Sequence, residues 1–315
     1  KTDATTYFNG LIDDVRIYNY ARTPDEIRLD YNAGFAAKFG YTGAGCQRDP
    51  ASCMTDGLVG YWNFEEGSGT QTYDQSDYAN NGILTNGPYW GGSTTTCKIG
   101  GCLTFDGVDD YVNLPDIGTG ETVPFSISVW VKTSSSAYHE VVSFGNTANN
   151  QPILELYIQT TAEYYYRDTA GRSSNLSGTT SINDNKWHYL VAVTSATNDH
   201  RLYVDGVQEA SGTTDISGVV LNTANIGVLQ RAIFQGYFNG SIDEVRIYNR
   251  ALSAEEIRYH YNRGGPAAHW KMDEGEGRTV YDATENNNDG TLVLAGSATS
   301  SAWVSGKYGS ALLLD

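Results

Sequence analysis

The segment YFNGSIDEVRIYNRALSAEEIRYHYNRG, residues 237–264, decides how this chain is organised, because a second version of it occurs in residues 7–34. That version reads YFNGLIDDVRIYNYARTPDEIRLDYNAG and aligns without a gap. The two segments agree at 18 of 28 positions. Internal similarity of this kind is the signature of repeated structural units. The chain is therefore predicted to contain more than one copy of a domain.

A second pair of matching segments sets the boundaries of the copies. Residues 60–84, GYWNFEEGSGTQTYDQSDYANNGIL, match residues 268–292, AHWKMDEGEGRTVYDATENNNDGTL. Farther along, CKIGGCLTFD (97–106) aligns with GKYGSALLLD (306–315). One complete domain is therefore expected at 57–264, within a longer tandem array. The other ranges are expected to be the C-terminal part of a preceding domain (1–34), a linker (35–56) and the N-terminal part of a following domain (265–315).

Apolar and polar residues alternate through the expected complete domain, and a period of two is typical of half-buried β-strands. The segments with this pattern are FSISVWVKT (125–133), EVVSF (140–144), ILELYIQ (153–159), WHYLVAVT (187–194), RLYVDGVQE (201–209) and SIDEVRIYN (241–249). Asp205-Gly206 favours a type I′ hairpin turn, which needs a positive φ at both central residues. Ile242, Val245 and Ile247 are the expected core positions of the last segment.

Each version of the repeated segment also contains one expected helix. Ser253 and Glu256 form an S-x-x-E capping box, and Gly264 is placed to end the helix. Thr23 and Glu26 repeat the box in the earlier version. The predicted fold class is therefore all-β, a β-sandwich with one short helix per copy.

The strings FDGVDDYV, SVWV, WH, LYVDG and GSIDEVRIYNRALS occur in this order within 57–264. Together they resemble the laminin-G-like branch of the concanavalin A-like lectin/glucanase superfamily. The resemblance implies a jelly roll of two antiparallel sheets packed face to face, here in one complete and two partial tandem copies. It also implies an extracellular binding or adhesion module, of a kind that often holds a structural calcium ion.

The charge balance excludes one class of partner. The chain has 20 Lys+Arg against 37 Asp+Glu, a formal net charge of −17. Binding to nucleic acid needs clustered basic side chains that neutralise phosphates, and the sequence has no such cluster. No stretch approaches the roughly 18 consecutive apolar residues of a membrane span. Neither a nucleic-acid partner nor a membrane span is expected in this segment.

Four cysteines lie in two close pairs, Cys46 with Cys53 and Cys97 with Cys102. Neither pair has CxxC spacing or a histidine at zinc-finger spacing, which disfavours a structural metal site. Two short disulfide loops are expected, with free thiols as the alternative, although four cysteines allow three pairings. Disulfides indicate an oxidising environment, so the expected location is extracellular or at the cell surface.

The carboxylates of the expected strands do not predict catalysis. Hydrolysis of a glycosidic bond normally needs two carboxylates that face each other across the substrate. Glu155 has no carboxylate two or four residues away, and Glu140 stands alone in its strand. The histidines are scattered, and no nucleophile elbow of the G-x-S-x-G type accompanies them. The chain is therefore predicted not to be an enzyme.

A calcium ion is the expected cofactor. Ca²⁺ takes six to eight oxygen ligands, and the loop YDQSDYANNG (73–82) is rich in them. The resemblance adds Asp243, at the position from which the last long strand reaches the ion. The candidate metal ligands are Asp74, Asn80 and Asp243. In the alternative, Asp74 and Asn80 make Asx turns and Asp243 caps a strand end.

Aromatic side chains supply the candidate glycan-binding residues, because rings stack on the apolar faces of sugars. Trp90 lies in the NGPYWGG loop, and Tyr164 and Tyr166 lie in a YYYR run. Alternate residues of a strand share one face, so these two tyrosines are expected to line the same surface. Packing of the tyrosines in the core is the alternative.

Two functions follow from these patterns. The first is a non-catalytic extracellular structural or adhesive protein, such as a cell-surface fibre, filament or adhesin, whose partners are neighbouring copies of the domain. The second is a carbohydrate-binding accessory region of a larger secreted glycan-active enzyme, whose partners are glycans.

Overall fold

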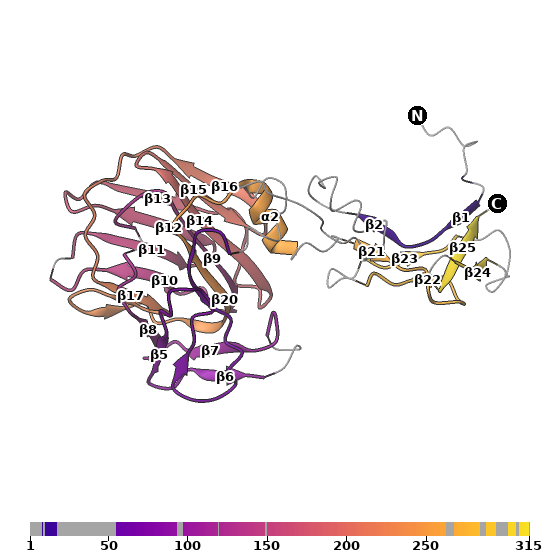
Figure 1. Ribbon diagram of the computed structural model, residues 1–315, viewed down its shortest axis with the longest axis horizontal. Helices are drawn as coiled ribbons and strands as arrows, with labels where there is room; N and C mark the ends of the chain where they lie inside the picture. Colours follow the sequence, from indigo (N-terminus) through magenta and orange to yellow (C-terminus); the bar gives the residue numbers. More distant parts are fainter. Residues whose placement is uncertain are drawn as a thin grey trace. The chain divides into compact units, whose positions relative to one another are not determined.

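The structure is a computed structural model, and it divides the chain into two units. One unit is Gly43–Tyr261, here called the larger unit, and the smaller unit combines Lys1–Thr42 with Asn262–Asp315. Figure 1 labels strands of both units. The residues that the structure describes are 8, 10–17, 55–92, 97–118, 120–148, 150–262, 268–283, 288–293, 302–306 and 309–314.

The larger unit is a sandwich of two antiparallel eight-stranded sheets (Figure 1). The first, here called the β10 sheet, has the order β13 (Ser173–Ser177), β12 (Ala162–Arg167), β11 (Ile153–Ile158), β10 (His139–Gly145), β17 (Thr223–Ile226), β8 (Tyr111–Leu114), β5 (Gly82–Thr85) and β4 (Gln71–Thr72). The second, here called the β9 sheet, has the order β16 (Val207–Gly212), β15 (Asp199–Val204), β14 (Trp187–Ala196), β9 (Phe125–Lys132), β20 (Asn239–Tyr248), β7 (Cys102–Asp106) and β6 (Tyr89–Gly91), with β3 (Leu58–Trp62) also paired to β20.

The predicted strands are confirmed, and their alternation fills the space between the sheets with apolar side chains. Phe144, Leu154 and Leu156 enter one buried cluster from the β10 sheet. Ile127 and Val129 enter it from the β9 sheet. The predicted hairpin turn between β15 and β16 is also confirmed, because Asp205 and Gly206 have φ values of 50° and 79°.

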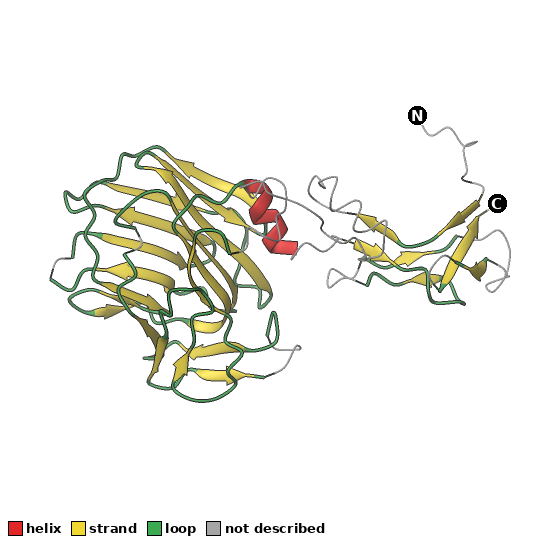
Figure 2. Ribbon diagram, in the orientation of Figure 1, coloured by secondary structure: helices red, strands yellow, loops and turns green. Residues whose placement is uncertain are grey.

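The opposite face of the β9 sheet is covered by the helix α2 (Ala254–Asn262), drawn in red in Figure 2. Ile257 of this helix packs in a second buried cluster with Trp130 and Tyr189 of the sheet. The predicted capping box starts the helix. The Glu256 N–H donates to Ser253 Oγ at 3.2 Å, and the Ser253 N–H donates to Glu256 Oε2 at 2.7 Å.

A β-bulge explains why the expected core positions of β20 are not evenly spaced. The register of β20 against β9 shifts between Asp243 and Arg246, and Glu244 has a φ of 56°. The extra residue turns Ile242 and Val245 to the same face although they are three positions apart. Glu244 forms a buried ion pair with Arg246, whose guanidinium lies 4.1 Å from the centre of the Tyr61 ring.

The smaller unit pairs the two flanking segments that the sequence assigned to different domains. β1 (Gly10–Ile12) pairs with β25 (Ser310–Leu314), and β25 pairs with β24 (Trp303–Ser305). β2 (Val15–Ile17) pairs with β21 (Ala268–Trp270). A further pair joins β22 (Thr279–Val280) to β23 (Gly290–Thr291). The segments 1–34 and 265–315 thus contribute strands to one unit.

Three sequence predictions lie outside the described residues. They are the capping box of Thr23 and Glu26, the helix end at Gly264, and the disulfide between Cys46 and Cys53. Across the described ranges, none of the helices has the length and apolar character needed to span a membrane.

Candidate functional site

The structure buries two of the three predicted sugar-stacking residues and leaves Trp90 half-buried. Tyr164 and Tyr166 share one face of β12, as expected, but that face is the core, where they are 1% and 2% exposed. The Tyr164 hydroxyl is 2.6 Å from Thr194 Oγ1, and the Tyr166 hydroxyl donates to the Gly120 carbonyl. Trp90 packs against the same core and donates its ring N–H to the Gly69 carbonyl. The ligand-binding role expected for the two tyrosines is therefore wrong, because the opposite sheet covers their rings.

The outer face of the β10 sheet, the face turned away from the core, carries the polar and aromatic residues of these strands instead. Cross-strand pairing places Asn225, Ser143, Glu155 and Tyr165 opposite one another on β17, β10, β11 and β12. Tyr157 follows Glu155 on the same face two residues along β11. The β9 sheet carries helix α2 on its own outer face. The outer face of the β10 sheet is therefore the candidate binding surface of the larger unit.

A short hairpin covers one part of this surface. It pairs β18 (Leu229–Gln230) with β19 (Phe234–Gln235) and lies directly on β10. The Ser143 hydroxyl donates to the Val228 carbonyl at 2.6 Å, and the Glu140 N–H donates to the Gly236 carbonyl at 2.7 Å. A Cβ added to Gly145 would lie 2.1 Å from the Gln230 carbonyl oxygen. Glycine at position 145 thus permits the close approach of the hairpin.

Two glutamates that the sequence treated as isolated come together beside this hairpin. Glu140 is completely buried and Glu155 nearly so. The two carboxyls lie on neighbouring strands and interact electrostatically. Burial raises the pKa of the Glu140 carboxyl well above its ordinary value, and Glu155 adds to the rise. Burial also raises the pKa of Glu155, while the Arg231 guanidinium of the hairpin opposes that rise. The Tyr138 hydroxyl donates a hydrogen bond to Glu140.

Several polar atoms around the two glutamates are buried without a hydrogen-bond partner among the described residues. They are Glu140 Oε2, Arg231 Nε and both side-chain atoms of Asn225, which is fully buried. Buried polar groups are normally hydrogen-bonded, so each such atom calls for a water or ligand partner. The amide at position 225 offers both a donor and an acceptor.

Aromatic rings flank the buried polar groups. The Tyr138 and Tyr157 rings lie 5.1 Å apart, and on the other side of the hairpin Tyr111 and Phe234 lie 5.3 Å apart. Tyr165 and Tyr157 are half-buried on the outer face of β12 and β11. Half-exposed rings beside amides and carboxyls can stack on a sugar and bond its hydroxyls.

The sequence contained one signal for this arrangement. Glu140 and Glu155 each interrupt an otherwise apolar strand, EVVSF and ILELYIQ, and these strands follow one another closely along the chain. Consecutive strands usually pair, so two buried carboxyls on one face were a readable possibility. The register of the two strands, which the sequence does not supply, places Glu140 opposite Tyr157 and Glu155 opposite Ser143, so the two carboxyls lie diagonally across neighbouring strands.

The predicted calcium loop is held by hydrogen bonds of its own. Asp74 Oδ1 accepts the N–H groups of Tyr61 and Ser76, both at 2.8 Å. Asp74 Oδ2 accepts the Ser76 hydroxyl at 2.7 Å and the Asn80 N–H at 2.8 Å. A carboxylate has about four lone-pair positions, and four donors take them all. Asp74 is thus arranged for an Asx turn, as in the alternative, and its role as a calcium ligand stays a prediction.

The aligned loop of the smaller unit repeats this network. Asp282 accepts the N–H groups of His269 and Asn288, both at 2.9 Å. These bonds correspond to those that Tyr61 and Asn80 make with Asp74. The recurrence of Asp and Asn in register is therefore explained by loop geometry.

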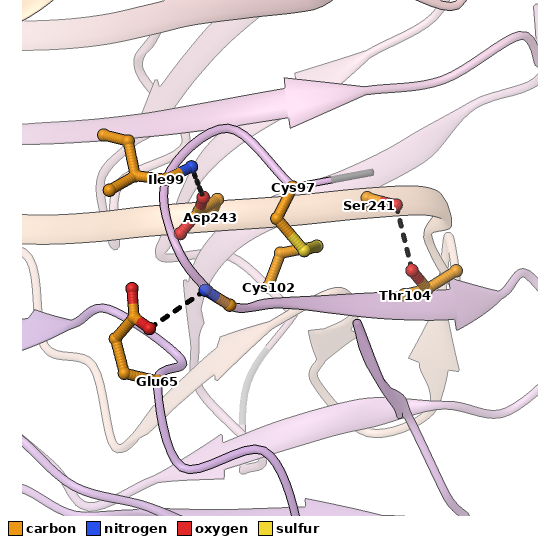
Figure 3. The surroundings of a disulfide bond; sticks show 8 residues. Glu65, Cys97, Ile99, Cys102, Thr104, Ser241 and Asp243 are labelled. Atoms are coloured by element: carbon orange, nitrogen blue, oxygen red, sulfur yellow. Dashed lines mark hydrogen bonds between the residues drawn. A yellow bond between two sulfur atoms is a disulfide. The ribbon is translucent and has the colours of Figure 1, made fainter. Parts of the chain in front are cut away.

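Asp243, the third predicted calcium ligand, anchors a disulfide loop (Figure 3). The predicted bond between Cys97 and Cys102 is present, and the Ile99 N–H between them donates to Asp243 Oδ2 at 2.8 Å. Burial raises the pKa of the Asp243 carboxyl to about 8. Asp74 and Asn80 bond to each other, whereas Asp243 lies inside β20, pairs with Trp130 of β9, and has a buried Oδ1 without a hydrogen-bond partner among the described residues. Calcium binding by the three residues stays a prediction. The bonds of Asp74 and Asn80 favour the Asx-turn alternative, and Asp243 does not lie at a strand end.

One other group of carboxylates lies close together within the described ranges. One oxygen each from Asp106, Asp109 and Asp110 lie within 4.8 Å of one another in the FDGVDD turn. Asp106 Oδ1 accepts the Val108 N–H at 2.7 Å, and Asp110 Oδ2 accepts the Asp106 N–H at 3.1 Å. These bonds shape the turn between β7 and β8.

A family of β-sandwich proteins matches the larger unit. Residues 106–258 match the model of a family described as the concanavalin A-like lectin/glucanases superfamily. No curated protein matches the chain. The matched range contains the strands β8 to β20 and the start of α2, and thus the β10 sheet without its edge strands β4 and β5.

Solved structures show the same fold at low sequence identity. The binding domain of Paraclostridial Mosquitocidal Protein 1 has a TM-score of 0.55 and 15% identity, over 72% of this chain and 55% of that chain. The ligand-binding domain of botulinum neurotoxin serotype D, in complex with N-acetylneuraminic acid, has a TM-score of 0.54 and 16% identity, over 74% and 59%. The chain thus spans less than two thirds of these structures. The described residues form an all-β, jelly-roll-like protein of the concanavalin A-like fold, with one short helix.

Proposed function

We propose that the larger unit is a non-catalytic carbohydrate-binding domain and that the outer face of its β10 sheet is the binding surface. The observation that carries the proposal is the pair of half-buried Tyr157 and Tyr165 rings on the same face as the exposed Asn175 and the half-buried Arg167. Rings that stack on a sugar and polar groups that bond its hydroxyls are the two parts of a carbohydrate site.

Each part of the surface has a separate task in this proposal. The rings of Tyr157 and Tyr165 supply stacking area at the accessible end. Arg167 of β12 and Asn175 of β13 lie on the same outer face and supply hydrogen bonds to hydroxyl groups. The hairpin carrying Phe234 and Arg231 forms the border of the surface on the side of β17.

The comparisons support a binding function of this type. The matched family is described as lectins and glucanases, and two of the similar structures are binding domains of toxins. One of those structures contains N-acetylneuraminic acid. Of the two functions that the sequence suggested, the carbohydrate-binding accessory region therefore has more support than the filament or adhesin.

The position of the carboxyl pair supports the non-catalytic part of this proposal. Glycoside hydrolysis needs both carboxyls at the sugar, one as acid and one as base or nucleophile. Glu140 is completely buried beside the hairpin, with Tyr138 on one oxygen. A substrate on the outer face therefore meets the tyrosines before it meets this carboxyl.

An extracellular location belongs to the same proposal. The Cys97–Cys102 disulfide lies in a loop fixed by Asp243, and disulfides persist in oxidising compartments. Glycans of cell surfaces and cell walls are available in the same compartment.

A glycan array probed with the intact chain tests the function. We expect a defined set of glycans to be retained, and the double variant Tyr157→Ala with Tyr165→Ala to weaken binding about tenfold or more, at roughly 1 kcal/mol per stacked ring. Tyr89→Ala is the matched control, because this exposed tyrosine lies on β6 of the other sheet. An array without retained glycans, or equal binding by the double variant and the control, would refute the proposal.

A further inference from the structure

The part of the β10 sheet that lies under the β18–β19 hairpin has polar residues on its outer face. Asn225 of β17, Ser143 of β10 and Glu155 of β11 stand opposite one another across neighbouring strands. The residues on either side of Asn225, Ala224 and Ile226, point into the core. Such alternation is typical of a strand whose outer face meets water. Here the outer face is covered instead, and Asn225 is 0% exposed.

The hairpin closes over these residues without pairing all of their polar atoms. The Ser143 hydroxyl donates to the Val228 carbonyl of the hairpin at 2.6 Å. In contrast, Oδ1 and Nδ2 of Asn225 and Oε2 of Glu140 are buried without a hydrogen-bond partner among the described residues. Burying a polar group without a partner is costly, because the group gives up its bonds to water. Another set of donors and acceptors in the place of the hairpin would remove this cost.

The hairpin itself is buried at its base and apolar at its tip. Val228 and Leu229 at the base are fully buried. Ile233 and Phe234 at the tip are 62% and 39% exposed. Apolar side chains of the hairpin thus face solvent while polar side chains of the sheet are covered, which is the reverse of the usual distribution.

Glycines with a left-handed backbone lie at both ends of the hairpin. Gly227 has a φ of 85° and Gly236 a φ of 69°. Glycine reaches this region without a steric penalty. Segments that open and close turn about a few positions of this kind, which take up the change in backbone angles. The hairpin therefore has a buried base, a hinge position at each end and a tip in solvent.

We infer that the β18–β19 hairpin is a flap over a second part of the sugar-binding surface. When the flap lifts, Asn225, Ser143 and Glu155 bond the hydroxyl groups of an uncharged sugar unit. An amide offers a donor and an acceptor, and a sugar hydroxyl can pair with either. The inference rests on the proposed function, because Tyr157 follows Glu155 on the same face of β11 and joins the two parts of the surface.

The charges under the flap favour an uncharged sugar over an acidic one. The carboxyls of Glu140 and Glu155 lie on neighbouring strands and interact with each other. The Arg231 guanidinium acts on both carboxyls, and it belongs to the flap. When the flap lifts, this cation moves away, and the carboxylate of an acidic sugar would meet two carboxyls. Like charges in one site disfavour binding.

Gly145→Ala tests the flap without any sugar. A Cβ at this position would lie 2.1 Å from the Gln230 carbonyl oxygen, and the backbone of Gly145 is not left-handed, so alanine fits the strand but displaces the hairpin. Trypsin cleavage after Arg231, followed by mass spectrometry, is expected to become about tenfold faster, because cleavage follows the open fraction. Gly92→Ala is the matched control, since a Cβ there meets nothing within 4 Å. Equal cleavage in the two variants would overturn the flap.

An array of neutral oligosaccharides, printed beside their sialylated forms, tests the sugar subsite. The intact chain is expected to retain neutral members. In calorimetry with the neutral oligosaccharide retained most strongly, Gly145→Ala is expected to bind about tenfold more tightly, because a larger fraction of the chain is open. If Gly145→Ala does not fold, a chain with residues 230–234 replaced by two glycines takes its place and is expected to show the same gain.

Asn225→Leu separates a binding role from a structural one. The change is expected to weaken binding of the same oligosaccharide about tenfold. It is also expected to keep or raise the melting temperature, because an apolar side chain of similar shape replaces a buried amide without partners. A lower melting temperature with unchanged binding would assign Asn225 a structural role and overturn the subsite.

The outcomes distinguish this inference from the proposed function. Retained neutral glycans with unchanged affinity in Gly145→Ala and Asn225→Leu would overturn the subsite and leave the proposed function intact. An array without any retained glycan would refute both. A preference for the sialylated members would overturn the assignment of an uncharged sugar.

Discussion

Replacing the two matching phenylalanines one at a time tests how differently the copies of the repeat are packed. Phe238 is fully buried, and its ring meets Phe105 edge to face at a centroid distance of 5.9 Å. Phe8 occupies the same place in the other version of the repeat and is 56% exposed. The residue type and the flanking sequence are shared, so the comparison isolates the effect of burial.

The expected magnitudes differ by several kcal/mol. Truncating a buried phenylalanine to alanine costs about 3–5 kcal/mol, because apolar contact is lost and a cavity remains. Phe238→Ala also removes the edge-to-face contact with Phe105, so the upper part of this range is expected. Phe8→Ala removes a side chain that is more than half in solvent, and a loss below about 1 kcal/mol is expected.

Urea unfolding of the intact chain, extrapolated linearly to water, measures the free energies. Hydrogen exchange then assigns each loss to its unit, since the amides of β20 and those of β1 and β2 report local opening separately. We expect Phe238→Ala to increase exchange in β20 and Phe8→Ala to leave it unchanged. Losses within about 1 kcal/mol of each other would refute the assignment of different packing to the two copies.

Two further predictions concern the acidic groups. Glu155 has a raised pKa in the folded state, so folding binds protons and the free energy of unfolding falls as pH rises above the ordinary glutamate range. Thermal melting at a series of pH values measures this fall. Glu155→Gln is expected to make it less steep, and Glu255→Gln, at an exposed residue of α2, is expected to leave it unchanged. A steeper fall in Glu155→Gln would contradict the prediction. Four hydrogen-bond donors occupy the carboxylate of Asp74, so the melting temperature of the chain is expected to be the same with calcium as with chelator. A higher melting temperature with calcium would support the predicted calcium site.

Local features of the fold were readable from the sequence because they depend on neighbouring residues. Asp205-Gly206 forms the predicted turn, since its positive φ values are a property of the dipeptide. Ser253 and Glu256 form the reciprocal hydrogen bonds of a capping box, which depend only on residues three positions apart. The short Cys97–Cys102 loop likewise closes within six residues.

The candidate binding surface was less predictable, because it depends on which sheet face meets the other sheet. Alternation correctly put Tyr164 and Tyr166 on one face of β12, and this face proved to be the core. Tyr165 lies on the accessible face instead. Glu140 and Glu155 are fifteen positions apart, and their placement on neighbouring strands of one face depends on the pairing of β10 with β11.

The sequence by itself determined the strand pattern, the helix start and the similarity of residues 7–34 to 237–264 and of 60–84 to 268–292. Each of these is set by period, capping or similarity along the chain. Only the tertiary structure decided that β1 and β2 pair with β25 and β21, more than 250 positions away. It also decided that Phe238 is buried while Phe8 is exposed, because burial depends on the sheet that packs over a strand and not on the strand's own residues.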